Sequence, residues 1–185
     1  MIKKGLYNVE KQKGLTLIES LVVVGILLGI IAVALTLFGT VRDRLNVKNE
    51  SENASFIFSQ IVDLYSDEKT TNLTQQDAID AGVFPKKMNI VGGTNVNNSW
   101  GGKVEVKGEG ETGFSLAYTK VSKSDVCVNF VKNQKKVGWD SVEVQKNTNS
   151  DYVDITFYKA DSTGESDGTP YSDYQNSVLI KDCNP

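Results

Sequence analysis

The feature that most constrains this chain is an apolar run of 24 residues, from Leu15 to Phe38, with a single charged side chain, Glu19. As an α-helix, such a run extends about 36 Å at about 1.5 Å per residue, and the hydrocarbon core of a bilayer is roughly 30 Å thick. Four lysines and one glutamate precede the run. By the positive-inside rule, we expect the N-terminus to stay in the cytoplasm, one membrane span to follow, and the remaining residues to lie outside.

Glu19 is the first candidate functional residue. A carboxylate at the centre of a membrane helix costs about 2.5 to 3.5 kcal/mol on insertion scales, and less near the interface, so such a group is expected to have a partner. The simpler alternative is that Glu19 only stabilises the start of the helix through the helix dipole, which is worth about 0.3 to 1 kcal/mol.

The residues at the start of the run, KGLTLIES from Lys13 to Ser20, resemble the prepilin peptidase recognition site of type IV pilins. In that family a short basic leader ending in glycine is removed before a hydrophobic helix, and glutamate is the fifth residue of the mature chain. The resemblance implies cleavage between Gly14 and Leu15, N-methylation of Leu15, and a prepilin peptidase as partner. Glycine at the cleavage site would let the peptidase approach the backbone closely.

Further features resemble the type IVb branch of this family. The leader has 14 residues, and the mature chain would start with leucine rather than phenylalanine. The mature chain would have 171 residues, which implies a relatively large head. The segment from Asn98 to Val104 also resembles a stretch found in type IVb pilins.

The resemblance gives Glu19 a partner. In filaments of this family the helices stack in a core that holds almost no water, where the Glu19 carboxylate would pair with the free amine of Leu15 on a neighbouring copy. A matched pair offsets part of the cost of burying each charge and fixes the register between subunits. We favour this pairing, because the helix-dipole alternative leaves the glycine and the leader unexplained. Gly25 and Gly29 form a G-x-x-x-G pattern that can bring membrane helices together, or that can simply be ordinary in such a helix.

We expect three parts along the chain: a cleaved leader at 1–14, an N-terminal helix at 15–66 and a globular head at 67–185. The helix would form the membrane span or filament core over 15–38 and continue as an amphipathic helix over 39–66. Apolar residues in the second half recur near the 3.6-residue spacing of a helix. The predicted inward stripe consists of Val41, Leu45, Ala54, Ile57, Ile61 and Leu64.

The head is predicted to be α+β, with an antiparallel sheet packed on the long helix, as in the pilin fold. The sequence TQQD at 74–77 is a capping-box pattern for a short helix that ends at Gly82. Residues 124–136 fit either a strand or a helix capped by Ser124, and we favour the helix. We expect Trp100 and Trp139 in the core. Alternating segments predict strands at 103–107, 113–119, 141–145, 152–158 and 177–181.

The chain has two cysteines, Cys127 and Cys183, both in the part expected outside the cytoplasm. An even number in an exported domain predicts one disulfide, and two isolated cysteines without histidine give poor support to a metal site. Type IV pilins carry such a bond, so the resemblance and the chemistry agree.

The composition argues against an enzyme, because the chain has no histidine and therefore no imidazole for acid–base or zinc chemistry. Asp161, Glu165 and Asp167 lie in a polar segment whose spacing does not fit an EF-hand, and the glycine pairs fit turns rather than a phosphate loop. We expect no cofactor and no metal. Without the leader the net charge would be −6, from 16 basic and 22 acidic residues, which disfavours nucleic-acid binding apart from a local basic patch at 132–136.

Together these features predict the major structural subunit of a type IVb pilus, a helical homopolymer for adherence, bacterial aggregation or conjugative contact. Its expected partners are other copies of itself, the prepilin peptidase, an inner-membrane assembly platform and a host or bacterial surface receptor. The chain would reside in the inner membrane as a prepilin, with its head in the periplasm, and then in an extracellular filament. The alternatives are a pseudopilin of a type II secretion system and a minor pilin of the same filament system.

Overall fold

The computed structural model describes residues 16–122, 125–147, 150–161 and 167–184 of the 185-residue chain. The predicted leader, Gly14 and Leu15 lie outside these residues, and so does Ser124. The chain divides into two compact units, residues 1–41 and residues 42–185.

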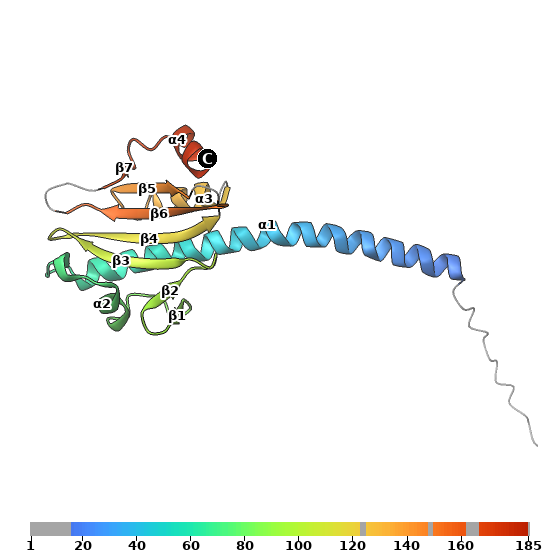
Figure 1. The fold of residues 1–185 in the computed structure, drawn as a ribbon, viewed down its shortest axis with the longest axis horizontal. Coiled ribbons are helices and arrows are strands. Elements are labelled where there is room, and N and C mark those ends of the chain that lie inside the picture. Colours follow the sequence, from blue (N-terminus) through green and yellow to red (C-terminus); the bar gives the residue numbers. More distant parts are fainter. Residues whose placement is uncertain (1–15, 123–124, 148–149, 162–166, 185) are drawn as a thin grey trace, which may run out of the picture. The chain divides into compact units, whose positions relative to one another are not determined.

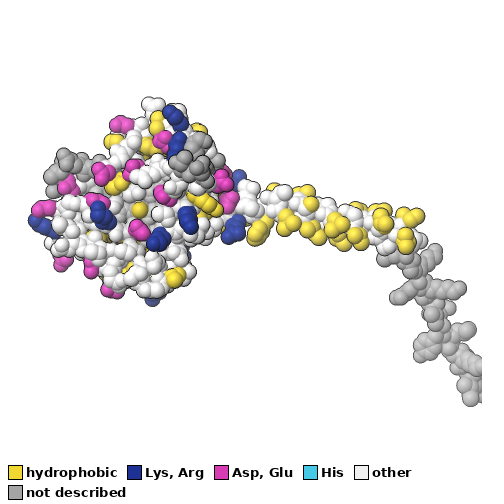
Figure 2. All heavy atoms as spheres, in the orientation of Figure 1, with side chains coloured by type: hydrophobic (Ala, Val, Ile, Leu, Met, Phe, Trp, Pro, Cys, Tyr) yellow, Lys and Arg dark blue, Asp and Glu magenta, His cyan; other side chains and the backbone are white. Residues whose placement is uncertain are grey.

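Helix α1 (Leu17–Leu64) is 48 residues long and begins in the first unit. Every large hydrophobic side chain from Leu17 to Val41 is exposed, with 49 to 80 % of its area accessible. Figure 2 shows these side chains as a succession of hydrophobic spheres along the helix. Among the described residues, α1 is the one helix long and apolar enough to cross a membrane, by length and composition. The long helix expected from the apolar run is therefore present.

In the second unit, α1 packs one face against the head. Its buried side chains recur every three or four residues and are Val47, Glu50, Ser51, Asn53, Ala54, Ile57 and Ile61. The predicted stripe is therefore wrong at Val41, Leu45 and Leu64, which are 55, 54 and 46 % exposed. Counting apolar residues misplaces the stripe because three of the buried positions carry polar side chains.

The strands form one antiparallel sheet of seven strands in the order β1-β2-β3-β4-β6-β5-β7 (Figure 1). The strands are β1 (Asn89–Val91), β2 (Asn95–Asn97), β3 (Lys103–Glu109), β4 (Gly113–Ser122), β5 (Ser141–Lys146), β6 (Tyr152–Lys159) and β7 (Thr169–Pro170). The predictions for β3, β4, β5 and β6 are confirmed. The sequence did not reveal β1, β2 and β7, which have only two or three residues each.

The pairing of β4 with β6 contains a bulge. Its register shifts between Tyr118 and Val121, and Lys120 within this interval has a φ of 57°. The Lys120 backbone N–H donates to Asp154 Oδ1 at 2.9 Å, which anchors the bulge to β6. Lys120 is thus a non-glycine residue held in the left-handed region, a conformation that disfavours a Cβ atom.

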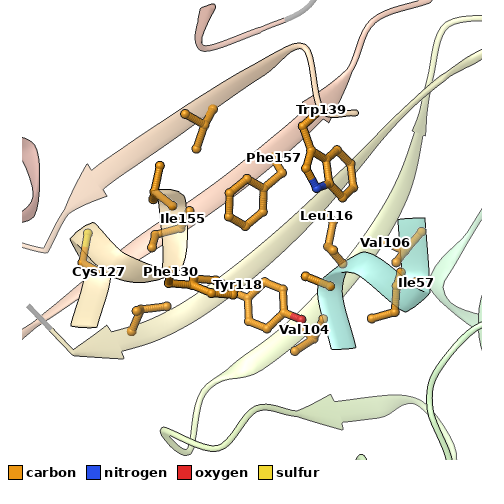
Figure 3. Close-up of a cluster of buried hydrophobic side chains, with 14 of the residues drawn as sticks. Ile57, Val104, Val106, Leu116, Tyr118, Cys127, Phe130, Trp139, Ile155 and Phe157 are labelled. Atoms are coloured by element: carbon orange, nitrogen blue, oxygen red, sulfur yellow. The ribbon is translucent and has the colours of Figure 1, made fainter. Parts of the chain in front are cut away.

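An aromatic cluster fills the core between the sheet and the helices (Figure 3). The ring centroid of Phe130 lies 4.9 Å from that of Tyr118, 5.4 Å from that of Phe157 and 5.4 Å from that of Trp100. Trp139 stacks on Phe157 at 5.7 Å and is 4 % exposed. The expectation that both tryptophans pack in the core is confirmed.

The remaining helices are η1 (Thr70–Asn72, a 3₁₀ turn), α2 (Gln75–Asp80), α3 (Asp125–Gln134) and α4 (Asn176–Cys183). The predicted capping box is present, since the Thr74 and Asp77 side chains each accept a hydrogen bond from the other residue's backbone N–H. Gly82, with a φ of 73°, follows the helix as expected. The helical interpretation of 124–136 is also confirmed by α3.

The strand predicted at 177–181 is wrong, because these residues belong to α4. Val178 and Ile180 alternate as in a strand, but they are 41 and 48 % exposed. The buried side chains are instead Leu179 and Cys183, which lie four residues apart, as on one face of a helix. A disulfide links Cys183 to Cys127 in α3, as predicted.

Candidate functional site

The start of α1 is a hydrogen-bonded cap built from Thr16 and Glu19. The Glu19 carboxylate accepts from the Thr16 backbone N–H at 2.9 Å and from the Thr16 hydroxyl at 3.0 Å, while the Glu19 backbone N–H donates to Thr16 Oγ1 at 3.3 Å. This reciprocal arrangement is a capping box, which satisfies amide groups that the first helical turn leaves free. The sequence TLIE at 16–19 carries the signal for this cap, and our reading of the sequence missed it.

Glu19 thus has a partner within its own chain and remains exposed. These hydrogen bonds support the alternative that Glu19 stabilises the start of α1. Leu15, whose amine is the predicted partner on a neighbouring copy, lies outside the described residues. Near Gly25 and Gly29, a Cβ atom would meet nothing within 4 Å. No contact with the described residues of this chain, therefore, requires glycine at either position.

A second polar site lies in the head, where α1 meets the turn after β2. Glu50 is only 2 % exposed. Its Oε1 atom accepts from the Ser99 backbone N–H at 2.8 Å and from the Ser99 hydroxyl at 2.5 Å, and its Oε2 atom accepts from Asn53 Nδ2 at 3.2 Å. These bonds fix the turn to α1. No local pattern in the sequence indicates this site, because a glutamate between charged residues on a helix is expected to face solvent.

The turn itself is organised by Asn98. Its Oδ1 atom accepts from the backbone N–H groups of Trp100 and Gly102 at 2.9 and 3.0 Å, and its Nδ2 group donates to the Thr119 carbonyl at 2.8 Å. Gly101 has a φ of 81°. A Cβ atom on Gly102 would lie 1.8 Å from the Thr119 carbonyl oxygen. The predicted role of the paired glycines as a turn is confirmed, and the segment that resembles type IVb pilins has a structural function in this chain.

A third set of contacts joins α3 to α1. Gln134 is fully buried, and its Nε2 group donates to the Ser51 carbonyl at 3.0 Å. Its Oε1 atom accepts from Trp139 Nε1 at 3.2 Å, and Asn133 Nδ2 donates to Ser51 Oγ at 3.1 Å. The disulfide therefore connects α4 to a helix that is itself hydrogen-bonded to α1.

Burial raises the pKa of several tyrosines in the head. For Tyr158, burial and the hydrogen bond that its hydroxyl donates to Glu143 at 3.1 Å raise the pKa to about 12. Burial and the nearby charge of Glu50 raise the pKa of Tyr118 well above its usual range, and burial raises that of Tyr171. These hydroxyls stay protonated at neutral pH. Tyr158 donates to Glu143 and Tyr171 donates to the Val131 carbonyl, whereas the Tyr118 hydroxyl is buried without a hydrogen-bond partner among the described residues.

Among the described residues, no three histidine, cysteine, aspartate or glutamate side chains come together as metal ligands. Of the three acidic residues in the polar segment, Asp161 and Asp167 lie among the described residues, whereas Glu165 lies outside them. The lysines of the basic patch at 132–136 are exposed around the end of α3.

A family model matches the part of the chain that contains Glu50, the turn after β2 and helix α3 with its disulfide-bonded Cys127. A family model described as PilS N terminal matches residues 44–179. The chain belongs to the PilS family. This family is pilin-related, and the long apolar helix with an α+β head agrees with that assignment. Searches of curated proteins and of solved structures gave no match.

The PilS match points to a structural subunit of the pilin type. The PilS match begins at Arg44, so it covers Glu50 and Cys127 and leaves Glu19 outside. The assignment to the family therefore rests on the second half of α1 and the head, independently of the residues around the predicted cleavage site.

Proposed function

We propose that this PilS-family chain is the major structural subunit of a type IVb pilus. The observation that carries the proposal is the apolar surface of α1 from Leu17 to Val41, exposed along its whole length in a chain whose head belongs to a pilin-related family. An apolar surface of this size is not stable in water. It fits a membrane before assembly and the helices of other copies afterwards.

The proposal includes processing and location. Prepilin peptidase cuts between Gly14 and Leu15, the new N-terminus is methylated, and the parts at 1–14, 15–66 and 67–185 act as leader, assembly helix and head. The prepilin sits in the inner membrane with its head in the periplasm. An assembly platform then adds copies to an extracellular filament that serves adherence, aggregation or conjugative contact, through a surface receptor where one exists.

Within the filament, Glu19 pairs with the amine of Leu15 on a neighbouring copy. The capping box supports a competing role, because the carboxylate already accepts two hydrogen bonds from Thr16. The two roles need different chemistry. Glutamine can replace glutamate in a capping box, but it carries no charge to neutralise an amine.

The substitution Glu19→Gln therefore separates the two roles, with Glu19→Ala as the variant that removes both. We expect both variants to be exported and cleaved, and both to lose filaments, as counted by electron microscopy of the producing cells. Normal filaments with Glu19→Gln and none with Glu19→Ala would refute the charge pairing and leave the cap as the function of Glu19.

To test whether the chain is a major pilin, filaments are sheared from cells, and the N-terminus and abundance of the chain are determined by mass spectrometry. A dominant sheared protein that starts at Leu15 supports a major pilin. A trace amount with the same N-terminus, or a chain that stays in the membrane, favours a minor pilin or a type II secretion pseudopilin. An intact Met1 contradicts the proposed processing. A bulky residue in place of Gly14 should leave the precursor uncut.

A further inference from the structure

Glu50 is a buried carboxylate that forms no ion pair among the described residues. It is 2 % exposed and accepts three hydrogen bonds, all from neutral groups of Ser99 and Asn53. The ion pairs of the described residues do not include it. A buried charge is normally paired, because removal from water is costly without a charged partner.

The acceptor atoms around Glu50 are not all used. Asn53 is 4 % exposed, its Nδ2 group donates to Glu50, and its Oδ1 atom is buried without a hydrogen-bond partner in the described structure. A carboxylate offers about four lone-pair positions, and Glu50 uses three of them. Asn53 Oδ1 and the fourth lone-pair position of Glu50 are thus left without a donor among the described residues.

Both residues line a pocket of about 330 Å³ formed by α1, β1, β2 and the turn after β2. Five of its nine lining residues are asparagines. The Asn98 oxygen already accepts two hydrogen bonds, whereas Asn53 Oδ1 can accept one or two. Lys87 also lines the pocket, but its ammonium lies 3.7 Å from Glu52, on the outer surface of α1.

Trp100 Nε1 and the Tyr118 hydroxyl are buried donors without a partner among the described residues, but neither residue lines this pocket. Within the pocket, the Glu50 carboxylate and Asn53 Oδ1 are the groups that a cation with N–H donors would satisfy.

We propose that this pocket is a binding site for an ammonium or guanidinium group, with Glu50 as its counter-ion and Asn53 Oδ1 as a second acceptor. Such a group supplies a positive charge and several N–H donors at once. A water molecule could satisfy Asn53 but not the charge of Glu50. A Ca²⁺ ion needs six to eight oxygen ligands, often several carboxylates, whereas the pocket lining offers one carboxylate.

The first test uses the full-length chain in detergent micelles and calorimetric titration with putrescine and with arginine methyl ester. Glu50→Gln keeps the side-chain shape and removes the charge. Asp63→Asn is the matched control, because Asp63 is an exposed carboxylate on the same helix that neither lines this pocket nor takes part in the ion pairs of the described residues. We expect at least one probe to bind, with affinity lowered about tenfold or more by Glu50→Gln and unchanged by Asp63→Asn.

Asn53→Ala is a second variant, in case Glu50→Gln does not fold. It should weaken binding several-fold, since it removes an acceptor and leaves the charge. Absence of binding by both probes, or equal affinity in the wild type and both pocket variants, would overturn the proposal. This test needs no filament, so its failure is distinct from failure of the proposed pilus function.

The cation can come from a small organic amine or from a side chain of a neighbouring copy, and assembled filaments distinguish the two. Filaments that bind the probe as the unassembled chain does identify a small amine as the occupant. Filaments that do not bind it, although the unassembled chain does, identify a side chain of a neighbouring copy.

Discussion

Removal of the Cys127–Cys183 disulfide is expected to lower the free energy of unfolding of the head by about 4 kcal/mol. The bond spans a sequence separation of 56 residues. For a loop of this size the chain-entropy expression gives about 14 cal/mol/K, which corresponds to about 4 kcal/mol at about 25 °C. The stabilisation arises because the bond restricts the unfolded chain, so the loss should occur even where the folded head keeps its packing.

The measurement is urea unfolding of the full-length chain in detergent, followed by tryptophan fluorescence. The chain has two tryptophans, Trp100 and Trp139, and both lie in the head, so the signal reports on the head alone. The samples are the oxidised wild type, the reduced wild type and the double variant Cys127→Ala/Cys183→Ala. Reductant should destabilise the wild type and have no effect on the double variant, which is the control for other effects of the reagent.

The reasoning would be refuted by a difference of less than about 1 kcal/mol between the oxidised and the reduced wild type, because loop closure accounts for about 4 kcal/mol. A larger loss in the double variant than in the reduced wild type would instead measure packing, since both cysteines are fully buried. Comparison of the two samples therefore separates chain entropy from the packing of the sulfur atoms.

Three further predictions concern the backbone and the tyrosines. Gly102→Ala should cost on the order of 3 kcal/mol of stability, because its Cβ would lie 1.8 Å from the Thr119 carbonyl oxygen. Gly25→Ala, whose Cβ would meet nothing within 4 Å, should stabilise α1 by up to about 1 kcal/mol through helix propensity; thermal unfolding compares the two variants. Lys120→Gly should raise stability by about 1 kcal/mol, because the φ of 57° disfavours a Cβ atom; no gain in urea unfolding would contradict this. Folding raises the pKa of Tyr158 from 10 to about 12, so the unfolded chain loses this proton first and stability should fall as pH rises from about 10 to about 12. Tyr158→Phe should lessen that fall, as measured by urea unfolding at about pH 9 and about pH 11.

The parts of the fold that the sequence predicted are those with a long or local signal. The apolar run predicted α1, because 24 residues are enough to establish a helix without knowledge of its neighbours. Alternation in the sequence predicted the four longer strands. The burial of β3 and β6 also alternates, whereas β4 and β5 are buried on both faces over part of their length. Thr74 and Asp77 predicted the start of α2, because a capping box is formed by residues three positions apart.

The failures share a physical cause, which is that tertiary contacts decide where local patterns are ambiguous. Val178 and Ile180 suggested a strand, but burial of Leu179 and the disulfide of Cys183 favour a helix at this place. Strands of two or three residues are too short for a periodic pattern. Glu50 was not predicted as buried, because its partner Ser99 is 49 residues away and no local rule connects them.

The strand order also has a consequence for the order in which the head can form. Strands β1 to β4 are neighbours in sequence and in the sheet, but the partner on the other side of β4 is β6, which follows α3 and β5. During synthesis from the N-terminus, β4 therefore presents an open edge until residues 152–159 have been made. Unpaired edges recruit other strands. The interval between β4 and β6 is thus the period in which the nascent head is most exposed to aberrant pairing and aggregation.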